Sequence, residues 1–225
     1  MYIDFHTHIL PEMDDGSNSV QESLLMIEKM RNAGVEIVIA TPHFYPHCES
    51  IEAFLKRRAN AYQLFNGALT GGPKVLLGCE VLLCKGMERM PGIERLCIEG
   101  TNCILIELPF YEWNHEIVAT LQQLSQMELL HIVMAHCNRY TKVQRKLLVE
   151  LGCDLEITME CLCSRWKRKR LRDIISGEKV VAVGSDMHRA GHKYPSMFTM
   201  DKKAKLCIET ILSRTDQLIG GIKIV

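Results

Sequence analysis

The sequence has no excess of charge of either sign. Its 225 residues carry 27 lysines and arginines against 27 aspartates and glutamates, so the formal net charge is zero at neutral pH. A chain without a strong positive field has no general attraction for nucleic acid or for an anionic membrane surface. We therefore expect no nucleic-acid partner.

Long apolar runs are also missing. No stretch approaches the roughly 18 apolar residues that a membrane span requires. Asp4, His6 and His8 interrupt the first residues, which therefore lack the apolar centre of a secretory leader. We expect no membrane insertion and a cytoplasmic location.

The ten cysteines form none of the usual chemical motifs. No pair has the C-x-x-C spacing of a zinc ribbon, and no cysteine has an arginine six residues later, as cysteine-dependent phosphatases require. Most cysteines lie in apolar stretches, as Cys103 does. The pattern indicates reduced thiols in a core rather than a disulfide frame or a cysteine nucleophile.

Short β-branched runs alternate with amphipathic stretches along the whole chain. Strands are predicted over 2–5, 35–40, 74–79, 103–107, 131–135, 153–158 and 180–183. Helices are predicted over 20–33, 52–65, 115–126, 141–151, 165–175 and 202–212, with Gly34, Gly152 and Gly177 as C-caps. This alternation predicts a parallel sheet covered by helices, as a barrel of seven βα units or an irregular eight. We expect one domain over residues 1–225.

Nearly every predicted strand ends in a side chain that can bind a metal ion. His6 and His8 are two residues apart, so on a strand both imidazoles point to the same side. The other strand-end residues are His43, Glu80, Glu107, His136, Asp186 and His188. The carboxyl ends of barrel strands share one rim, where these groups would repel one another or lack partners without cations.

The donor types favour a particular class of ion. Imidazole and carboxylate ligands without thiolate indicate manganese, iron or zinc rather than copper(I) or a structural zinc. A carboxylate such as Glu80 can bridge two ions, an arrangement that activates water. We expect divalent ions of manganese, iron or zinc at this rim.

The motifs together resemble the PHP (polymerase and histidinol phosphatase) superfamily. Its opening motif is similar to Ile3-Asp4-Phe5-His6-Thr7-His8 followed by Asp14-Asp15-Gly16. The segments 41–43, 78–81, 106–109, 135–140 and 184–188 resemble its branch of bacterial manganese-dependent protein-tyrosine phosphatases of capsule and exopolysaccharide synthesis. The match covers roughly residues 1–195, and it implies a distorted (β/α)7 TIM-like barrel with up to three ions.

The resemblance also implies a ligand set for each ion. One ion would be held by His6, His8, Glu80 and Asp186, and a second by Glu80, His43 and His136. A third would be held by Asp15 and His188 with His8 or Glu107.

We expect four catalytic residues, two of which are positions that the resemblance implies. Arg139 matches a phosphate-binding arginine, whereas Lys193 stands where the family usually has a second arginine, and Asn138 replaces a common glutamate. Glu107 or His188 would supply a proton to the leaving group. The expected substrate is a phosphotyrosine protein, in particular the tail of a bacterial tyrosine kinase.

Other functions stay open at this point. A small-molecule phosphatase of the same superfamily, such as one acting on histidinol phosphate, would show nearly the same motifs. An amidohydrolase would usually add a strand-end lysine and eight full βα units. A catalytically inactive binding module would be expected to lack ligands, and none is missing.

Two further segments have alternative interpretations. The basic run 165–172 is predicted to be a helix with a solvated cationic face, or else a docking site for an acidic peptide or kinase tail. Tyr111, Glu112 and Trp113 follow a strand, so their aromatic rings either line the barrel mouth or pack in the core.

Overall fold

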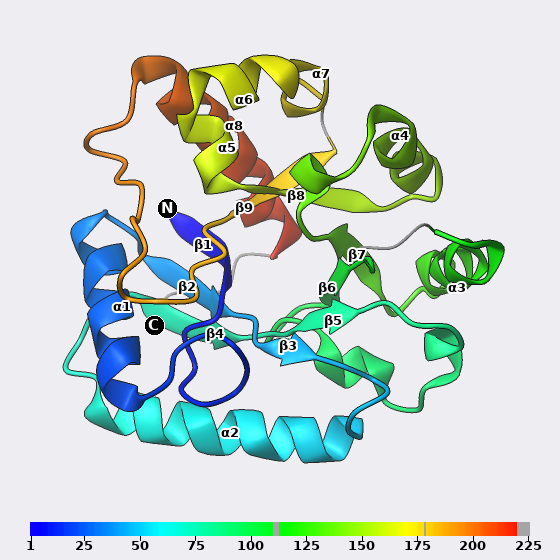
Figure 1. Cartoon of the computed structure of the whole chain (residues 1–225), viewed down its shortest axis with the longest axis horizontal. Helices are drawn as coiled ribbons and strands as arrows, with labels where there is room; N and C mark the ends of the chain where they lie inside the picture. The colour runs from blue at the N-terminus through cyan, green and yellow to red at the C-terminus, as the bar shows by residue number, and fades with distance from the viewer. Residues whose placement is uncertain (110–112, 178, 220–225) are drawn as a thin grey trace.

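The fold is a set of parallel strands surrounded by helices, as Figure 1 shows. The computed structural model describes residues 1–109, 113–177 and 179–219. The described strands are β1 (Ile3–Thr7), β2 (Ile37–Ala40), β3 (His43–Phe44), β4 (Lys74–Leu77), β5 (Glu80–Leu82), β6 (Cys103–Glu107), β7 (His131–Met134), β8 (Asp154–Thr158) and β9 (Val180–Gly184). All of their pairings are parallel.

The strands form two hydrogen-bonded groups, in the orders β1-β2-β4 and β3-β5-β6-β7-β8-β9. Only Thr41 and Pro42 separate β2 from β3, and only Gly78 and Cys79 separate β4 from β5. The pairing continues across these breaks, because Gly78 N donates to Ala40 O at 2.8 Å and Glu80 N donates to Pro42 O at 3.1 Å. Each pair of segments is therefore one interrupted strand, and the sheet has the seven strand positions that the sequence predicts.

The first and last strands also meet. Thr7 and Met187 form a parallel bridge, Asp186 N donates to His6 O at 2.9 Å, and His8 N donates to Met187 O at 3.0 Å. The structure is thus a distorted TIM-like barrel. This junction places the two-residue motif of His6 and His8 directly beside that of Asp186 and His188.

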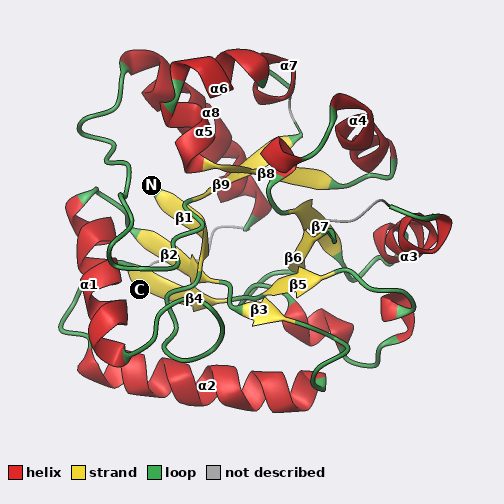
Figure 2. Ribbon diagram, in the orientation of Figure 1, coloured by secondary structure: helices red, strands yellow, loops and turns green. Residues whose placement is uncertain are grey.

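Helices cover the outside of the strands, as the red ribbons of Figure 2 show. They are α1 (Val20–Asn32), α2 (Ile51–Ala68), α3 (His115–Ser125), α4 (Lys142–Glu150), α5 (Met159–Cys163), α6 (Arg165–Arg170), α7 (Arg172–Ile175) and α8 (Lys202–Leu218), with 3-10 turns η1 (Met87–Arg89), η2 (Ile93–Leu96) and η3 (Cys137–Arg139). Short polar side chains accept from the first turn of each long helix, at Ser19, Ser50, Asn114, Thr141 and Asp201. Within the described residues, no helix combines the length and the apolar character needed to cross a membrane.

The structure corrects several details of the predicted helices. The single helix expected over 165–175 is divided at Leu171, whose side chain is buried against the core, and α5 was not predicted. Gly34 and Gly152 follow helices with φ of 89° and 88°, as expected for C-caps. Gly177 does not adopt a left-handed conformation, so the C-cap predicted there is wrong.

The core consists of the strand side chains and the inner faces of the helices. Every residue of β1, β2, β6 and β9 is buried. The ten cysteines all lie in the described part of the chain and are free thiols, of which six are buried. This distribution fits their interpretation as reduced core residues.

Candidate metal centre

The centre begins at the end of β1, where His6 and the following His8 are completely buried and point to the same side. Their Nε2 atoms lie 3.2 Å apart. Both also lie near Glu80 at the start of β5, because Oε2 of Glu80 is 3.1 Å from His6 Nε2 and 3.4 Å from His8 Nε2. Three side chains far apart in sequence thus converge on one point inside the barrel rim.

Glu80 also contacts two further imidazoles. His136 Nε2 lies 2.9 Å from Glu80 Oε1, and His43 Nδ1 lies 3.1 Å from Glu80 Oε2. The Glu80 side chain is fully buried, and burying a carboxylate is costly unless cationic partners surround it. Four imidazoles therefore surround the Glu80 carboxylate.

Asp186 closes the cluster from the end of β9. Its Oδ1 lies 3.8 Å from His6 Nε2 and 3.6 Å from His8 Nε2, and its Oδ2 lies 3.9 Å from His136 Nδ1. His136 and Asp186 both adopt the left-handed backbone region, with φ of 53° and 54°. Such conformations are unfavourable for non-glycine residues and concentrate at functional sites.

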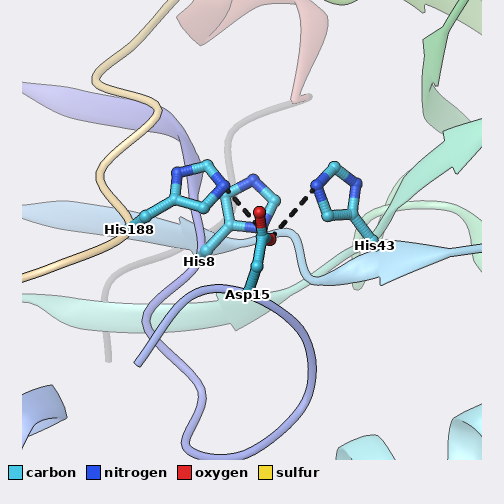
Figure 3. A group of neighbouring side chains, drawn as sticks. All are labelled: His8, Asp15, His43 and His188. Atoms are coloured by element: carbon cyan, nitrogen blue, oxygen red, sulfur yellow. Dashed lines mark ion pairs between the residues drawn. The ribbon is translucent and has the colours of Figure 1, made fainter. Parts of the chain in front are cut away.

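A second part of the centre gathers around Asp15, as Figure 3 shows. Asp15 Oδ1 lies 3.6 Å from His43 Nε2 and 3.4 Å from His188 Nε2. The ring of His188 stacks on that of His8 with 3.9 Å between centroids. His8, Asp15, His43 and His188 offer four donor atoms close enough together to hold a cation.

Neighbouring groups fix the orientation of two of these rings. Asp14 Oδ2 accepts a 2.7 Å hydrogen bond from His8 Nδ1. His8 Nε2 is therefore the ring nitrogen that faces the cluster and can bind a metal ion. His188 Nδ1 donates to the backbone carbonyl of Asp186 at 3.0 Å, which leaves His188 Nε2 facing Asp15. A hydrogen bond from the second ring nitrogen is the usual way in which proteins orient histidine ligands.

The carboxylates make the centre strongly attractive to positive charge. Burial lowers the pKa of His8, but hydrogen bonds and charge from Asp14 and Glu80 outweigh burial and raise it to about 9. Burial raises the pKa of Glu80, but His6 and the other histidines hold it well below its usual range. The buried anions therefore require cations, and divalent ions would satisfy them.

The pKa values of two other imidazoles, those of His43 and His188, are lowered, which favours their neutral form. Burial lowers the pKa of His43, and the charge of His8 lowers it further. Burial and His8 likewise lower the pKa of His188. Neutral imidazole is the form that binds a metal ion, so both side chains suit a ligand role.

The residues present fit metal ions. Among the described residues, the buried atoms without a hydrogen-bond partner include His6 Nδ1, His43 Nδ1, His136 Nδ1 and Glu80 Oε2. The remaining three groups of possible ligand atoms are His6, His136, Asp186; His6, His8, Glu80; and His43, Glu80, Glu107. Oxygen and imidazole nitrogen without thiolate is a donor set for manganese, iron or zinc. How these ligands divide among individual ions stays a prediction.

Arg139 lies at the edge of the cluster. Its Nη1 donates to Glu107 Oε1 at 3.0 Å and its Nη2 donates to Asp186 Oδ2 at 3.2 Å. The Arg139 side chain is 38% exposed, so it can meet a ligand that enters from solvent. Burial and the charge of Glu80 raise the pKa of Glu107, which favours its protonated form.

Lys193 is not brought into this cluster. It is exposed, and its side chain makes no hydrogen bond or ion pair with any described residue. Arg189 lies nearby in sequence but serves the Asp15 loop, since its Nη1 donates to the carbonyl oxygen of Gly16. Among the described residues, Arg139 is the arginine that contacts the centre.

Sequence reasoning missed the residues that support the ligands. Glu156 on β8 is fully buried and accepts from the backbone N–H groups of His136 and Gly184 at 2.7 and 3.0 Å. Asp4 is also buried and accepts from Ser185 N at 2.8 Å and from the Tyr194 hydroxyl at 2.7 Å. An acidic residue inside a buried strand was the available signal for both.

Tyr111 and Glu112, considered as possible mouth residues, lie outside the described residues. Trp113 packs its ring edge-on against Tyr140, with centroids 5.2 Å apart, and is half-buried against the core. This contact corresponds to the packing alternative for Trp113.

Fold and centre together define an α/β barrel with a histidine- and carboxylate-rich, metal-type site at the carboxyl ends of its strands. A sequence profile described as "Capsular polysaccharide synthesis, CpsB/CapC" matches residues 2–214. The chain belongs to this family.

Two curated relatives match along nearly the whole chain. The tyrosine-protein phosphatase CpsB of Streptococcus pneumoniae is 23% identical over 215 residues, covering 87% of this chain and 86% of the relative. The tyrosine-protein phosphatase YwqE of Bacillus subtilis is 27% identical over 235 residues, covering 96% and 91%.

Solved structures share the fold. One, from work on Bacillus subtilis YwqE and Streptococcus pneumoniae CpsB as unique metal-dependent tyrosine phosphatases, has a TM-score of 0.63 at 22% identity and covers 96% of this chain and 86% of that one. The histidinol phosphate phosphatase of Lactococcus lactis, solved with zinc, L-histidinol and phosphate, has a TM-score of 0.56 at 10% identity and covers 97% and 94%.

Proposed function

We propose that this chain is a metal-dependent protein-tyrosine phosphatase that acts on a phosphotyrosine protein of capsule or exopolysaccharide synthesis. The observation that carries the proposal is the position of Glu80, which lies within 3.4 Å of four imidazoles at the barrel rim. Family membership and the names of the full-length relatives favour phosphotyrosine over other phosphomonoesters.

In this proposal the ligands are His6, His8, Asp15, His43, Glu80, His136, Asp186 and His188. Two or three divalent ions, with manganese preferred over iron or zinc, would neutralise the phosphate charge and polarise its oxygens. The chain's own contribution is to hold these donor atoms in fixed positions before the substrate arrives.

Arg139 would bind the phosphate directly. Its guanidinium already spans two carboxylates, on Glu107 and Asp186, in the fork geometry that also suits two phosphate oxygens. Glu107, whose pKa is raised by burial and by Glu80, would hold a proton beside the leaving phenolate. Lys193, whose side chain lies outside the cluster, would contribute only long-range positive charge.

The leaving group also fits. A tyrosine phenolate has a pKa near 10, so it departs with little acid help and needs no strong proton donor. Phosphoryl transfer depends mainly on alignment and charge stabilisation, which a rigid cluster at a barrel rim supplies. The partner would be a kinase tail in the cytoplasm, and residues 1–225 would act as one domain.

The direct test measures hydrolysis of a phosphotyrosine peptide, of p-nitrophenyl phosphate and of histidinol phosphate, each with Mn²⁺ and with chelator. We expect metal-dependent turnover of the first two. His136→Ala and Asp186→Ala should reduce turnover to background while circular dichroism stays unchanged.

The control variant is His115→Ala, at the exposed start of α3 and outside the cluster. It should retain full activity. Full activity in either cluster variant, or turnover of histidinol phosphate in place of the peptide, would overturn the proposal.

A further inference from the structure

A basic groove lies between α6, α7 and α8, on elements that hold none of the metal-type ligands. It has a volume of about 980 Å³. Seven of its thirteen lining residues are lysine or arginine, and Asp201 is the only carboxylate among them. Figure 1 shows α6 beside α8, away from α1 and α2.

Three of the cations and the one carboxylate make contacts within the groove. Arg165 Nε lies 3.8 Å from Asp201 Oδ2. Arg168 Nη2 donates to both oxygens of Asp201, at 3.1 and 2.9 Å. Arg214 Nη1 donates to the carbonyls of Gly177 and Val180, at 2.7 and 2.9 Å. These contacts join α6 to the start of α8, and the end of α8 to the segment before β9.

The other cations are available for a ligand. Lys169, Arg172, Lys202 and Lys203 are exposed, and within 1–109, 113–177 and 179–219 their side chains make no hydrogen bond or ion pair. Four unpaired positive charges along one groove create a local field even though the whole chain has zero net charge. The expected ligand is therefore an anion with several charges.

Part of the lining of the groove is apolar. Ile175 and Cys207 line it, together with Leu206, which is 65% exposed. A ligand that carried only charge would leave these side chains in water. The lining suits a chain in which acidic and apolar residues alternate.

We propose that the basic groove binds an extended acidic peptide with interspersed apolar residues, which forms part of the phosphoprotein substrate outside its phosphotyrosine. This inference rests on the proposed function for the source of the peptide. From Asp201 to Arg214 the groove runs roughly 20 Å along α8, at about 1.5 Å per helical residue. That length accommodates about six residues of extended chain.

The shape and lining favour a peptide over other polyanions. A bilayer surface cannot enter a concave groove, whereas a groove of this volume can enclose peptide side chains. None of the described residues that line the groove is aromatic, so the lining offers no ring for base stacking.

The first test measures binding without any catalysis. A fluorescein-labelled octapeptide, Glu-Glu-Leu-Glu-Glu-Leu-Glu-Glu, is titrated with protein and followed by fluorescence anisotropy. Lys169→Glu/Lys203→Glu should weaken binding about tenfold or more, because like charges then face the peptide. The control is Lys56→Glu/Lys146→Glu, which makes the same change in net charge at exposed sites on α2 and α4 and should bind as the unaltered chain does.

The second test links the groove to catalysis. A phosphotyrosine peptide with this acidic segment attached should have a lower KM than the same peptide without it. The groove variant should remove that difference while turnover of p-nitrophenyl phosphate stays unchanged.

The outcomes separate the two proposals. Unaltered p-nitrophenyl phosphate turnover without any peptide binding would overturn the groove proposal alone. Peptide binding without phosphatase activity would support the groove while the proposed function fails. Binding to phosphatidylglycerol vesicles or to oligo(dT) in place of the peptide would overturn the assignment of a peptide ligand.

Discussion

Asp14 Oδ2 accepts hydrogen bonds from His8 Nδ1 at 2.7 Å and from the backbone N–H of His43 at 2.8 Å. One carboxylate therefore positions two proposed ligands that come from different strands. Its other oxygen accepts from Gly16 N at 2.8 Å, which shapes the loop that carries Asp15. Burial raises the pKa of Asp14, but His8 outweighs burial and lowers it to about 2, so the carboxylate stays ionised.

We predict that Asp14→Asn weakens metal binding about 10- to 100-fold, the usual effect of losing a partner that orients a histidine ligand. The amide keeps the size of the side chain but removes the charge that holds His8. The measurement is p-nitrophenyl phosphate turnover against Mn²⁺ concentration, where saturation should shift to higher metal. Asp216→Asn, exposed on α8, serves as the control. An identical metal dependence in both variants would contradict the role given to Asp14.

Removing metal is expected to destabilise the folded chain. A ligand that binds only the folded state adds about 2.7 kcal/mol when present at 100 times its Kd. For a chain of this size, that corresponds to a rise in Tm of roughly 5–10 °C. Differential scanning calorimetry with Mn²⁺ and with chelator measures the shift. The same Tm in both conditions, for protein shown to be metal-free in chelator, would count against a metal centre in the folded chain.

The barrel was largely predictable because parallel strands buried on both faces leave continuous apolar runs. The seven strand positions agree with the prediction. The breaks at Pro42 and Gly78 were not predicted, since hydrophobic periodicity does not show where a ladder changes partners. The division of the basic segment at Leu171 was also not predicted. The residues of α6 and α7 both favour helix in sequence, and only tertiary packing separates the two helices.

The convergence of the strand-end ligands was predictable from their positions, since carboxyl ends share one rim, whereas Asp15 was implied only by the family resemblance. The supporting carboxylates were less accessible. Glu156 lies between apolar residues of its strand. The sequence does not indicate that its oxygens accept hydrogen bonds from backbone groups at the ends of β7 and β9. Lys193 differs from these residues, because its motif position does not bring its side chain into the cluster, and its role stays a prediction.

Arg139→Lys should raise KM for a phosphotyrosine peptide about tenfold and lower kcat less. Lysine keeps the charge but loses the two-pronged contact with phosphate oxygens. Because Arg139 also contacts Glu107 and Asp186, metal content must be measured by mass spectrometry for both proteins. A loss of activity that follows loss of metal, with KM unchanged, would show that Arg139 acts on the ligands rather than on the phosphate.

Gly184 lies where β9 passes closest to the cluster. A Cβ at this position would lie 2.3 Å from His6 Cβ and 2.9 Å from Glu156 Oε1. We expect Gly184→Ala to destabilise the chain by about 2–3 kcal/mol through overpacking. Gly67→Ala is the matched control, because Gly67 lies in α2 and an added Cβ there would meet nothing within 4 Å, so alanine should stabilise the helix by about 0.5–1 kcal/mol. Urea unfolding in chelator measures both, and equal effects would refute the steric argument.

Asp154 joins β8 to His131 at the start of β7 and to Lys179 just before β9, outside the metal-type ligands. Its oxygens lie 2.7 Å from His131 Nε2 and 3.1 Å from Lys179 Nζ. Burial raises the pKa of Asp154, but hydrogen bonds from His131 and Lys179 outweigh it and lower the pKa below 3.8. The ionised form therefore stabilises the fold above that value, and this contribution disappears as the pH falls through the lower folded-state pKa. We expect Asp154→Asn to cost about 1 kcal/mol above about pH 5 and progressively less in stronger acid. Urea unfolding across this range, with Asp216→Asn as control, measures the difference, and a cost that grows towards low pH would contradict the sign.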